Sequence, residues 1–191
     1  MPAISALLPK KITTYYEPFI GGGAVLFNLQ PKKAIINDFN SELINVYSVV
    51  KNNLNELIKD LKTHQNDSDY FYQLRSLDRT KDFKKLSDIQ RASRIIYLNK
   101  TCYNGLYRVN SSGEFNSPFG KYKNPNIVNE PTLKAVSEYL KSNDIQLLNS
   151  DYSDILKNAE KNSFIYFRPS LSSSIREFKF YRVRSRWMER T

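Results

Sequence analysis

The stretch ITTYYEPFIGGGA, residues 12–24, decides the fold. Its first five residues are rich in β-branched and aromatic side chains, which favours a strand. Gly21, Gly22 and Gly23 follow that strand and precede the apolar segment AVLFNL. Consecutive glycines let a backbone turn sharply and approach a ligand closely, although a plain tight turn explains them equally well. The loop matches neither the P-loop pattern, because the lysine is missing, nor the full G-x-G-x-x-G pattern.

Strand-like and helix-like segments alternate along the rest of the chain. Short apolar runs typical of strands lie at residues 34–38, 145–151 and 163–167. Helical spacing runs from Ser41, a candidate cap, to Leu61, and SDIQ (87–90) has the pattern of a capping box. Further helices are expected in TLKAVSEYLK (132–141) and SDILKNAE (153–160). This alternation predicts a doubly wound α/β fold with a mostly parallel sheet.

Acidic residues stand where three of these strands end, namely Glu17, Asp38 and Asp151. In a doubly wound sheet the carboxyl ends of parallel strands share one edge, and ligands bind there. An aspartate in the place of Asp38 can accept hydrogen bonds from ribose hydroxyls, although an aspartate after a strand is often only a helix cap. Taken with the glycine loop, Asp38 favours a cofactor that contains a nucleoside.

Composition narrows the class of protein. The 191 residues carry a net charge of +10, which favours nucleic acid as a partner. Half of that charge lies in residues 168–191, which hold seven basic and two acidic side chains. One cysteine, Cys102, and one histidine, His64, exclude a disulfide framework and count against a cysteine metal cluster or a histidine dyad. Without a long apolar run or signal peptide, we expect no membrane association and a cytoplasmic location.

Residues 99–126 form a long polar segment with little periodicity, called here the recognition loop. Basic side chains alternate in it with tyrosines and phenylalanines, and its Ser112-Gly113 pair fits the turn of a hairpin. Arginine, amide and aromatic groups on a projecting loop can read base edges, stack on bases and hold phosphates. An ordinary irregular insertion is the alternative, but the length of the segment favours a functional loop.

Four blocks of the chain resemble successive blocks of the Dam-type DNA adenine-N6 methyltransferases. They are YYEPFIGGGAVLF, INDFNSELINVY, RIIYLNKTCYNGLYRVNSSGEFNSPFGKYKNPNI and NSDYSDIL, and the resemblance covers roughly residues 9–167. It implies a Rossmann-like methyltransferase sheet with an inserted DNA-recognition region at about residues 63–131. It also implies S-adenosylmethionine as cofactor, double-stranded DNA as partner, a GATC-like target and a monomer. A solitary methylase and one paired with a restriction enzyme both fit.

The resemblance also assigns roles to individual residues. Glu17, Phe19 and Gly21 would lie beside the cofactor, Asp38 would hold its ribose hydroxyls, and Asp151 and Tyr152 would contact its adenine. Enzymes of this kind flip an adenine out of the duplex and methylate its N6 atom. The residues expected to contact DNA are Tyr103, Asn104, Leu106, Arg108, Asn110, Pro118, Lys121, Tyr122 and Lys123.

The chain departs from the family at both ends, so we expect a domain truncated at both, without the C-terminal strands of the sheet. The family has (Asp/Asn)-Pro-Pro-Tyr after the fourth strand, whereas this chain has Arg168, Pro169, Ser170 and Leu171. Arginine cannot accept the hydrogen bond of the target amine, and losing one such partner costs about 10²–10³ in rate. The catalytic motif is therefore not intact, and we expect no methylation.

A shifted reading frame accounts for this departure. Suitable synonymous codons for residues 168–183, read with one nucleotide removed after the codon for Phe167, encode Asp-Pro-Pro-Tyr-Leu-Pro-Leu-Ser and a continuation that resembles the family. This hypothesis makes residues 1–167 an incomplete methyltransferase domain and residues 168–191 an out-of-frame tail. The alternative for the tail is a basic arm that grips DNA. The alternatives for the whole chain are a catalytically dead DNA-binding module and a non-functional pseudogene product.

Overall fold

The computed structural model describes residues 12–157, 159–167 and 179–182. They belong to two compact units. Unit 1 combines the residues up to Ile44 with those from Tyr139 onward, and unit 2 is Asn45–Glu138. Unit 2 contains residues 63–131, for which a DNA-recognition region is expected. The two units are described one at a time.

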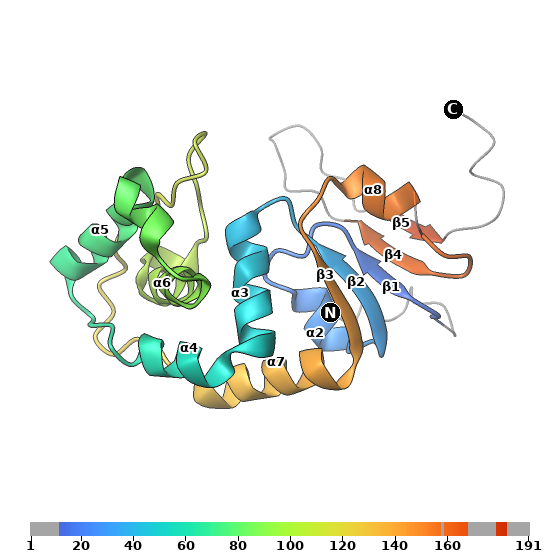
Figure 1. Cartoon of the computed structure of the whole chain (residues 1–191), viewed down its shortest axis with the longest axis horizontal. Coiled ribbons are helices and arrows are strands. Elements are labelled where there is room, and N and C mark those ends of the chain that lie inside the picture. Colours follow the sequence, from blue (N-terminus) through green and yellow to red (C-terminus); the bar gives the residue numbers. More distant parts are fainter. Residues whose placement is uncertain (1–11, 158, 168–178, 183–191) are drawn as a thin grey trace. The chain divides into compact units, whose positions relative to one another are not determined.

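Unit 1 is built on a five-stranded sheet with the order β3-β2-β1-β4-β5 (Figure 1). Four strands are parallel, and β5 pairs antiparallel with β4. The chain moves outward from β1 through β2 to β3 and then returns to the other side of β1, so the strand order reverses between β1 and β4. The predicted mostly parallel sheet is therefore confirmed. Its strands are β1 (Tyr15–Glu17), β2 (Lys33–Asn37), β3 (Asp144–Leu148), β4 (Phe164–Phe167) and β5 (Lys179–Arg182).

Both faces of the central strands are buried, as expected of a sheet covered on both sides. Tyr16 and Ile165, in register on neighbouring strands, pack with Ile155 of helix α8 (Tyr152–Lys157). Tyr15 and Phe164 point to the opposite face, where their rings lie 6.0 Å apart. Helix α2 (Ala24–Leu29) follows the glycine loop and buries Val25 and Leu26.

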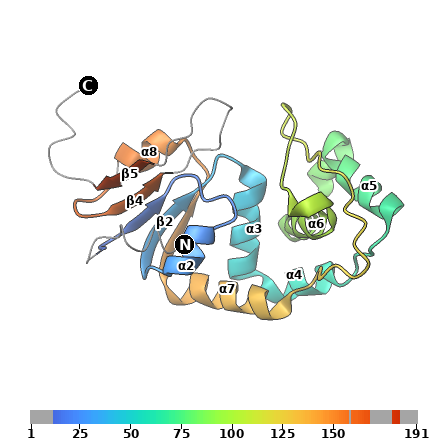
Figure 2. The ribbon, with the colours of Figure 1, turned by 180° about the vertical axis from the view of Figure 1, so that it is seen from behind.

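Unit 2 is helical, and Figure 2 shows α6 with α5 beside it and the chain segment after α6 running past both. Helix α6 supplies Ala92 to one core cluster and Tyr97 and Leu98 to a second. The predicted capping box is present, because Ser87 and Gln90 each bind the backbone of the other at the start of α6. The elements of unit 2 are α4 (Leu54–Leu61), α5 (Ser68–Ser76), η1 (Leu77–Arg79), η2 (Lys81–Lys85), α6 (Asp88–Thr101) and η3 (Tyr103–Gly105). Helices α3 (Ser41–Asn52) and α7 (Glu130–Ser142) each belong partly to unit 1 and partly to unit 2.

Two local predictions were wrong. The helical spacing from Ser41 to Leu61 belongs to two helices, which are separated at Asn53, where φ is −130°. Ser41 is the first helical residue rather than the cap, because the side chain of Asn40 accepts the backbone N–H of Glu42 at 3.0 Å. An asparagine before a helix is as good a cap as serine, so the sequence alone did not distinguish Asn40 from Ser41.

Candidate functional site

The predicted glycine loop and Asp38 meet in unit 1. The backbone N–H of Gly21 donates to Oδ2 of Asp38 at 3.1 Å, and that of Asn40 donates to Oδ1 at 3.0 Å. Gly21 has a φ of +49°, and a Cβ added to Gly21 or Gly22 would meet no atom within 4 Å. The glycines therefore border open space instead of serving only a packed turn.

Asn37 ties the ends of three strands together and was missed in the sequence. Its buried amide donates to the carbonyl oxygens of Pro18 and Ser150 at 3.0 and 3.1 Å, and its Oδ1 accepts the N–H of Ser150 at 2.9 Å. Asn149 adds a hydrogen bond to the carbonyl of Asp38 at 2.8 Å. A polar residue inside the otherwise apolar run AIIND was the available signal, since a buried amide needs partners.

Aromatic rings lie at the same edge of the sheet. Phe19, Tyr152 and Phe167 pack around one another with centroid distances of 5.1 to 5.7 Å. Tyr152 is 42% exposed, and Phe39, next to Asp38, is 81% exposed. Phe39 and Phe167 were missed, although both stand directly after or at the end of a predicted strand. Exposed aromatic faces at a strand end can stack on a planar base.

The two other acids of this edge differ in their surroundings. Glu17 is buried and accepts the hydroxyl of Tyr15 at 2.7 Å. Burial, assisted by the charge of Glu17, raises the pKa of Tyr15 well above its ordinary value, so this tyrosine stays protonated. Asp151 accepts the N–H of Ser153 at 2.8 Å, and hydrogen bonds from Ser153 lower its pKa. Asp151 therefore remains a carboxylate that can accept a hydrogen bond from an exocyclic amine.

These groups, named here the strand-end site, fit the adenosine part of S-adenosylmethionine. Each Asp38 oxygen accepts one backbone N–H and has further acceptor capacity for a ribose hydroxyl. Phe39 and Tyr152 offer aromatic faces, and Asp151 offers an acceptor for the adenine amine. The structure thus brings Phe19, Gly21, Asp38 and Tyr152 to one edge, as expected from the sequence.

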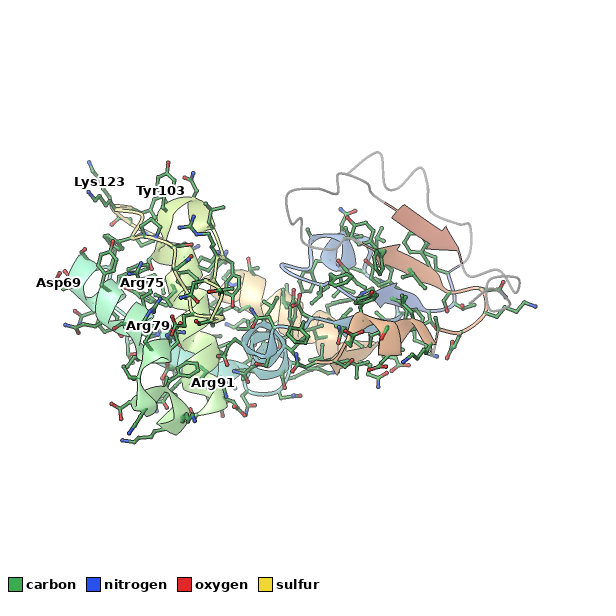
Figure 3. All side chains as sticks on the ribbon, turned by 90° about the horizontal axis from the view of Figure 1, so that it is seen from above. Asp69, Arg75, Arg79, Arg91, Tyr103 and Lys123 are labelled. Carbon is green, nitrogen blue, oxygen red and sulfur yellow. The ribbon has the colours of Figure 1, made fainter. Side chains whose placement is uncertain are left out.

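The predicted DNA-contacting residues all lie in unit 2. Eight of the nine are exposed: Tyr103, Asn104, Leu106, Arg108, Pro118, Lys121, Tyr122 and Lys123. Figure 3 shows Tyr103 and Lys123 at one end of this unit, with Arg75 and Arg79 further in. Asn110 is only partly exposed, because its side chain accepts the N–H groups of Ser112 and Glu114 at 3.0 Å each. Asn110 therefore closes the predicted hairpin.

The two ends of the recognition loop are fastened to each other. The N–H of Tyr103 donates to the carbonyl of Pro118 at 2.8 Å, and the N–H of Asn104 donates to the hydroxyl of Tyr122 at 3.0 Å. Gly120 permits this arrangement, because a Cβ there would lie 2.6 Å from the ring of Tyr122 and 2.7 Å from the carbonyl of Cys102. Four predicted positions, Tyr103, Asn104, Pro118 and Tyr122, are thereby brought together.

Arg108 stands on the hairpin and is oriented by a residue that the sequence did not reveal. The hairpin is confirmed by the bridge between Val109 and Phe115 and by the 2.9 Å bond from the N–H of Asn116 to the carbonyl of Arg108. Nε of Arg108 also donates to Oδ1 of Asn116 at 2.9 Å. The guanidinium is thus held at its Nε side.

Cys102 and His64, the single cysteine and histidine of the chain, have structural roles. Cys102 is fully buried in the second core cluster of unit 2, as expected. His64 lies between Tyr70 and Ser93 at 2.6 and 2.9 Å, and burial lowers its pKa, so the ring is neutral near pH 7.

Among the described residues no cluster of three or more histidine, cysteine or acidic side chains forms a metal site. In the part of the chain that the structure describes, no helix is long and apolar enough to span a membrane.

The residues expected at the catalytic motif, Arg168, Pro169, Ser170 and Leu171, lie outside the described residues. Strand β4 ends immediately before them at Phe167, whose ring contacts Phe19 and Tyr152. The described part of β4 therefore reaches the strand-end site.

Comparison with known proteins identifies the family. Residues 1–191 match the model of the D12 class N6 adenine-specific DNA methyltransferases. The type II methyltransferase M1.LlaDCHI of Lactococcus lactis subsp. cremoris is 47% identical over 171 residues, covering 88% of this chain and 60% of that protein. The type II methyltransferase M.MjaIII of Methanocaldococcus jannaschii is 42% identical over 180 residues, covering 85% and 61%.

A DNA adenine methylase of Serratia marcescens is 36% identical over 175 residues, covering 88% of this chain and 62% of that protein. The chain thus spans about three fifths of the length of the curated relatives it matches. The family model covers the whole chain, and the α/β fold agrees with it. The chain belongs to the D12 class of N6 adenine-specific DNA methyltransferases.

Proposed function

We propose that unit 1 binds S-adenosylmethionine and that unit 2 binds double-stranded DNA at a GATC-like site. The observation that carries the proposal is the carboxylate of Asp38 held between the N–H groups of Gly21 and Asn40 beside an open glycine turn. When bound, S-adenosylmethionine supplies an electrophilic methyl group. The residues of this chain would orient its ribose and adenine and, in unit 2, hold the duplex. The reaction of the family is methyl transfer to N6 of adenine.

We further propose that the chain as given does not methylate. The target amine needs acceptors that orient its lone pair toward the methyl group, and the first residue after β4 is Arg168, which has none. A shifted frame from about residue 168 explains this sequence. The nucleotide sequence of the gene around the codon for Phe167 tests it: a single-base change must restore Asp-Pro-Pro-Tyr in frame. If no such change does, the frameshift hypothesis is wrong.

A catalytically inactive DNA-binding module is the second candidate, because the exposed recognition loop is fully assembled in unit 2. Three assays on the purified chain separate the candidates. Transfer of labelled methyl groups to a GATC duplex would contradict the proposed inactivity. A sequence-selective, salt-dependent gel shift without transfer supports the binding module. Insoluble protein with neither activity supports a pseudogene product.

Cofactor binding is tested by titration calorimetry with S-adenosylmethionine. Asp38→Asn keeps the size of the side chain and removes its charge, so binding should weaken. Asp144→Asn is the matched control, because Asp144 is an exposed aspartate at the other end of a strand, the start of β3. Equal binding by both variants would contradict the assignment of the site.

A further inference from the structure

Beneath the hairpin of the recognition loop lies a charged cluster that neither the family assignment nor the predicted contact residues include. Arg94 of helix α6 is 2% exposed, and its guanidinium contacts Oδ2 of Asp78 at 2.8 Å. Nε and Nη2 of Arg94 also donate to the carbonyls of Leu74 and Arg75 at 2.7 Å each. Arg79 contacts the other oxygen of Asp78 at 2.7 Å. Asp78 is therefore fixed from two sides.

This cluster binds the backbone of one hairpin strand. Oδ2 of Asp78 accepts the N–H of Phe115 at 2.8 Å, and Nη2 of Arg79 donates to the carbonyl of Phe115 at 2.8 Å. Arg75 donates to the carbonyl of Ser117 at 3.2 Å. Figure 3 shows Arg75 and Arg79 in this interior part of unit 2. The backbone on both sides of residue 116 is thereby held by charged groups.

The residue between these anchored positions is Asn116, and its side chain holds Arg108. Oδ1 of Asn116 accepts Nε of Arg108 at 2.9 Å, and its carbonyl lies 3.5 Å from Nη2. The donors at the far edge of a guanidinium held in this way suit a two-point contact with guanine. An arginine without such support loses more side-chain entropy when it binds a base.

We propose that Asp78, Arg94 and Asn116 are positioning residues that preorganise the guanidinium of Arg108 for reading a base in DNA. Asp78 and Arg94 fix the strand that carries Asn116, and Asn116 fixes the direction of the guanidinium. The inference deepens the proposed function and rests on DNA binding by unit 2. It assigns a specificity role to Asn116 and a supporting role to a buried ion pair, neither of which needs to touch a base.

The test is a double-mutant cycle in the full chain. Binding by wild type, Asn116→Ala, Arg108→Ala and the double variant is measured by fluorescence anisotropy on a duplex with a central GATC and on duplexes with single base changes. Arg108→Ala should reduce the preference for one base by about 5- to 100-fold. Asn116→Ala should reduce the same preference by about 2- to 10-fold, and should have no effect when Arg108 is already alanine. Asn55→Ala, an exposed amide of helix α4 in unit 2 but outside the recognition loop, is the control.

Results that contradict the role of Asn116 differ from the result that contradicts the proposed function. If Asn116→Ala weakens all duplexes equally and lowers the salt dependence, Asn116 contacts phosphate and the proposal is wrong. If its effect persists in the Arg108→Ala background, it does not act through Arg108, which also overturns the proposal. If the wild type shows no base preference at all, the proposed function is what fails. Nitrogen-15 spectra then test the hydrogen bond from Nε of Arg108 to Asn116 directly. The Nε–H of Arg108 must be protected from exchange in the wild type, and that protection must be lost in Asn116→Ala.

The role of the ion pair between Asp78 and Arg94 is tested with Asp78→Asn. Because this substitution also lowers stability, the orientation of Arg108 is measured only where the variant is folded. At a temperature where circular dichroism shows this variant folded, the Nε–H signal of Arg108 should lose its protection. Unchanged protection and unchanged base preference in folded Asp78→Asn would remove Asp78 and Arg94 from the proposal.

Discussion

In unit 1 a neutral amide, Asn37, joins the loops that carry the strand-end site, whereas in unit 2 a buried ion-pair cluster around Asp78 binds the backbone of the recognition loop. In unit 1, Asn37 ties the loops after three strands, and the topology of the sheet brings those loops together. In unit 2, no sheet aligns the recognition loop. Asp78 and Arg79 instead form hydrogen bonds with the backbone N–H and carbonyl of Phe115 in that loop. A site whose loops are positioned by the strand order of a sheet needs few additional side chains to hold it. An irregular loop needs side chains elsewhere in the fold that form hydrogen bonds with its backbone.

The largest effect is expected from breaking the support in unit 2. Asp78→Ala leaves the guanidinium of Arg94 buried without its carboxylate, which should lower the free energy of unfolding by about 3–5 kcal/mol. Urea unfolding followed by circular dichroism measures the loss. Lys33→Ala, which removes an exposed ion pair with Glu160 in unit 1, should change stability far less, because solvent screens the pair. Equal losses in the two variants would show that the Asp78 cluster is not a main support.

A smaller effect is expected at the strand-end site, and it concerns binding rather than folding. Asp38→Asn removes the charge from the proposed hydrogen bonds to the ribose, so the Kd for S-adenosylmethionine should rise about 10- to 100-fold. Calorimetric titration at constant pH measures the change, with Asp144→Asn unaltered. An affinity unchanged in Asp38→Asn would mean that Asp38 serves only to join the backbone at Gly21 and Asn40.

The glycines of the two regions sharpen the comparison further. Gly120→Ala places a Cβ against the ring of Tyr122 and the carbonyl of Cys102, so it should cost about 1–3 kcal/mol of stability. Gly22→Ala meets no atom within 4 Å and should change stability by less than about 0.5 kcal/mol. Thermal unfolding of both variants tests this contrast. A reversed order would mean that the loop of unit 2 adjusts easily and the glycine turn does not.

The smallest effect is expected from pH, through His64 in unit 2. Burial lowers the pKa of His64 in the folded chain, so the unfolded chain binds a proton more readily. Its contribution to stability is complete above the unfolded pKa of about 6.5 and is lost as the pH falls toward the folded pKa. Urea unfolding at about pH 7.5 and about pH 5.5 should show lower stability in acid. The difference should shrink in His64→Gln, and a difference of the same size in that variant would assign it to other groups.

The sequence predicted the parallel sheet because buried strands need apolar runs, and residues 34–38 and 163–167 have them. It also predicted α6, whose capping box is a local signal. Helix α5 was missed because its polar surface hides the buried Phe71, although Asp67, which accepts the N–H of Tyr70, marked its start. Such short amphipathic helices gain stability from tertiary packing, which a sequence pattern shows poorly.

The residues of the strand-end site were easier to predict from the sequence than the residues that support the recognition loop. Asp38 and Gly21 follow strands directly, so the topology of the sheet implies where they meet. Asn116 and Arg94 act through hydrogen bonds that join residues eight to twenty positions apart or more, and no periodic pattern marks them. Supports of this kind become visible only when the backbone partners are known.

The three-way tie made by Asn37 has a consequence for local opening. The amides of Ile20 and Ser150 belong to loops that follow different strands, yet both donate to Asn37, at 2.9 Å each. Neither loop can leave the sheet without releasing the same residue. In hydrogen–deuterium exchange the two amides should therefore open as one cooperative unit with a common protection factor. The edge of the sheet that faces the cofactor would then loosen in a single step.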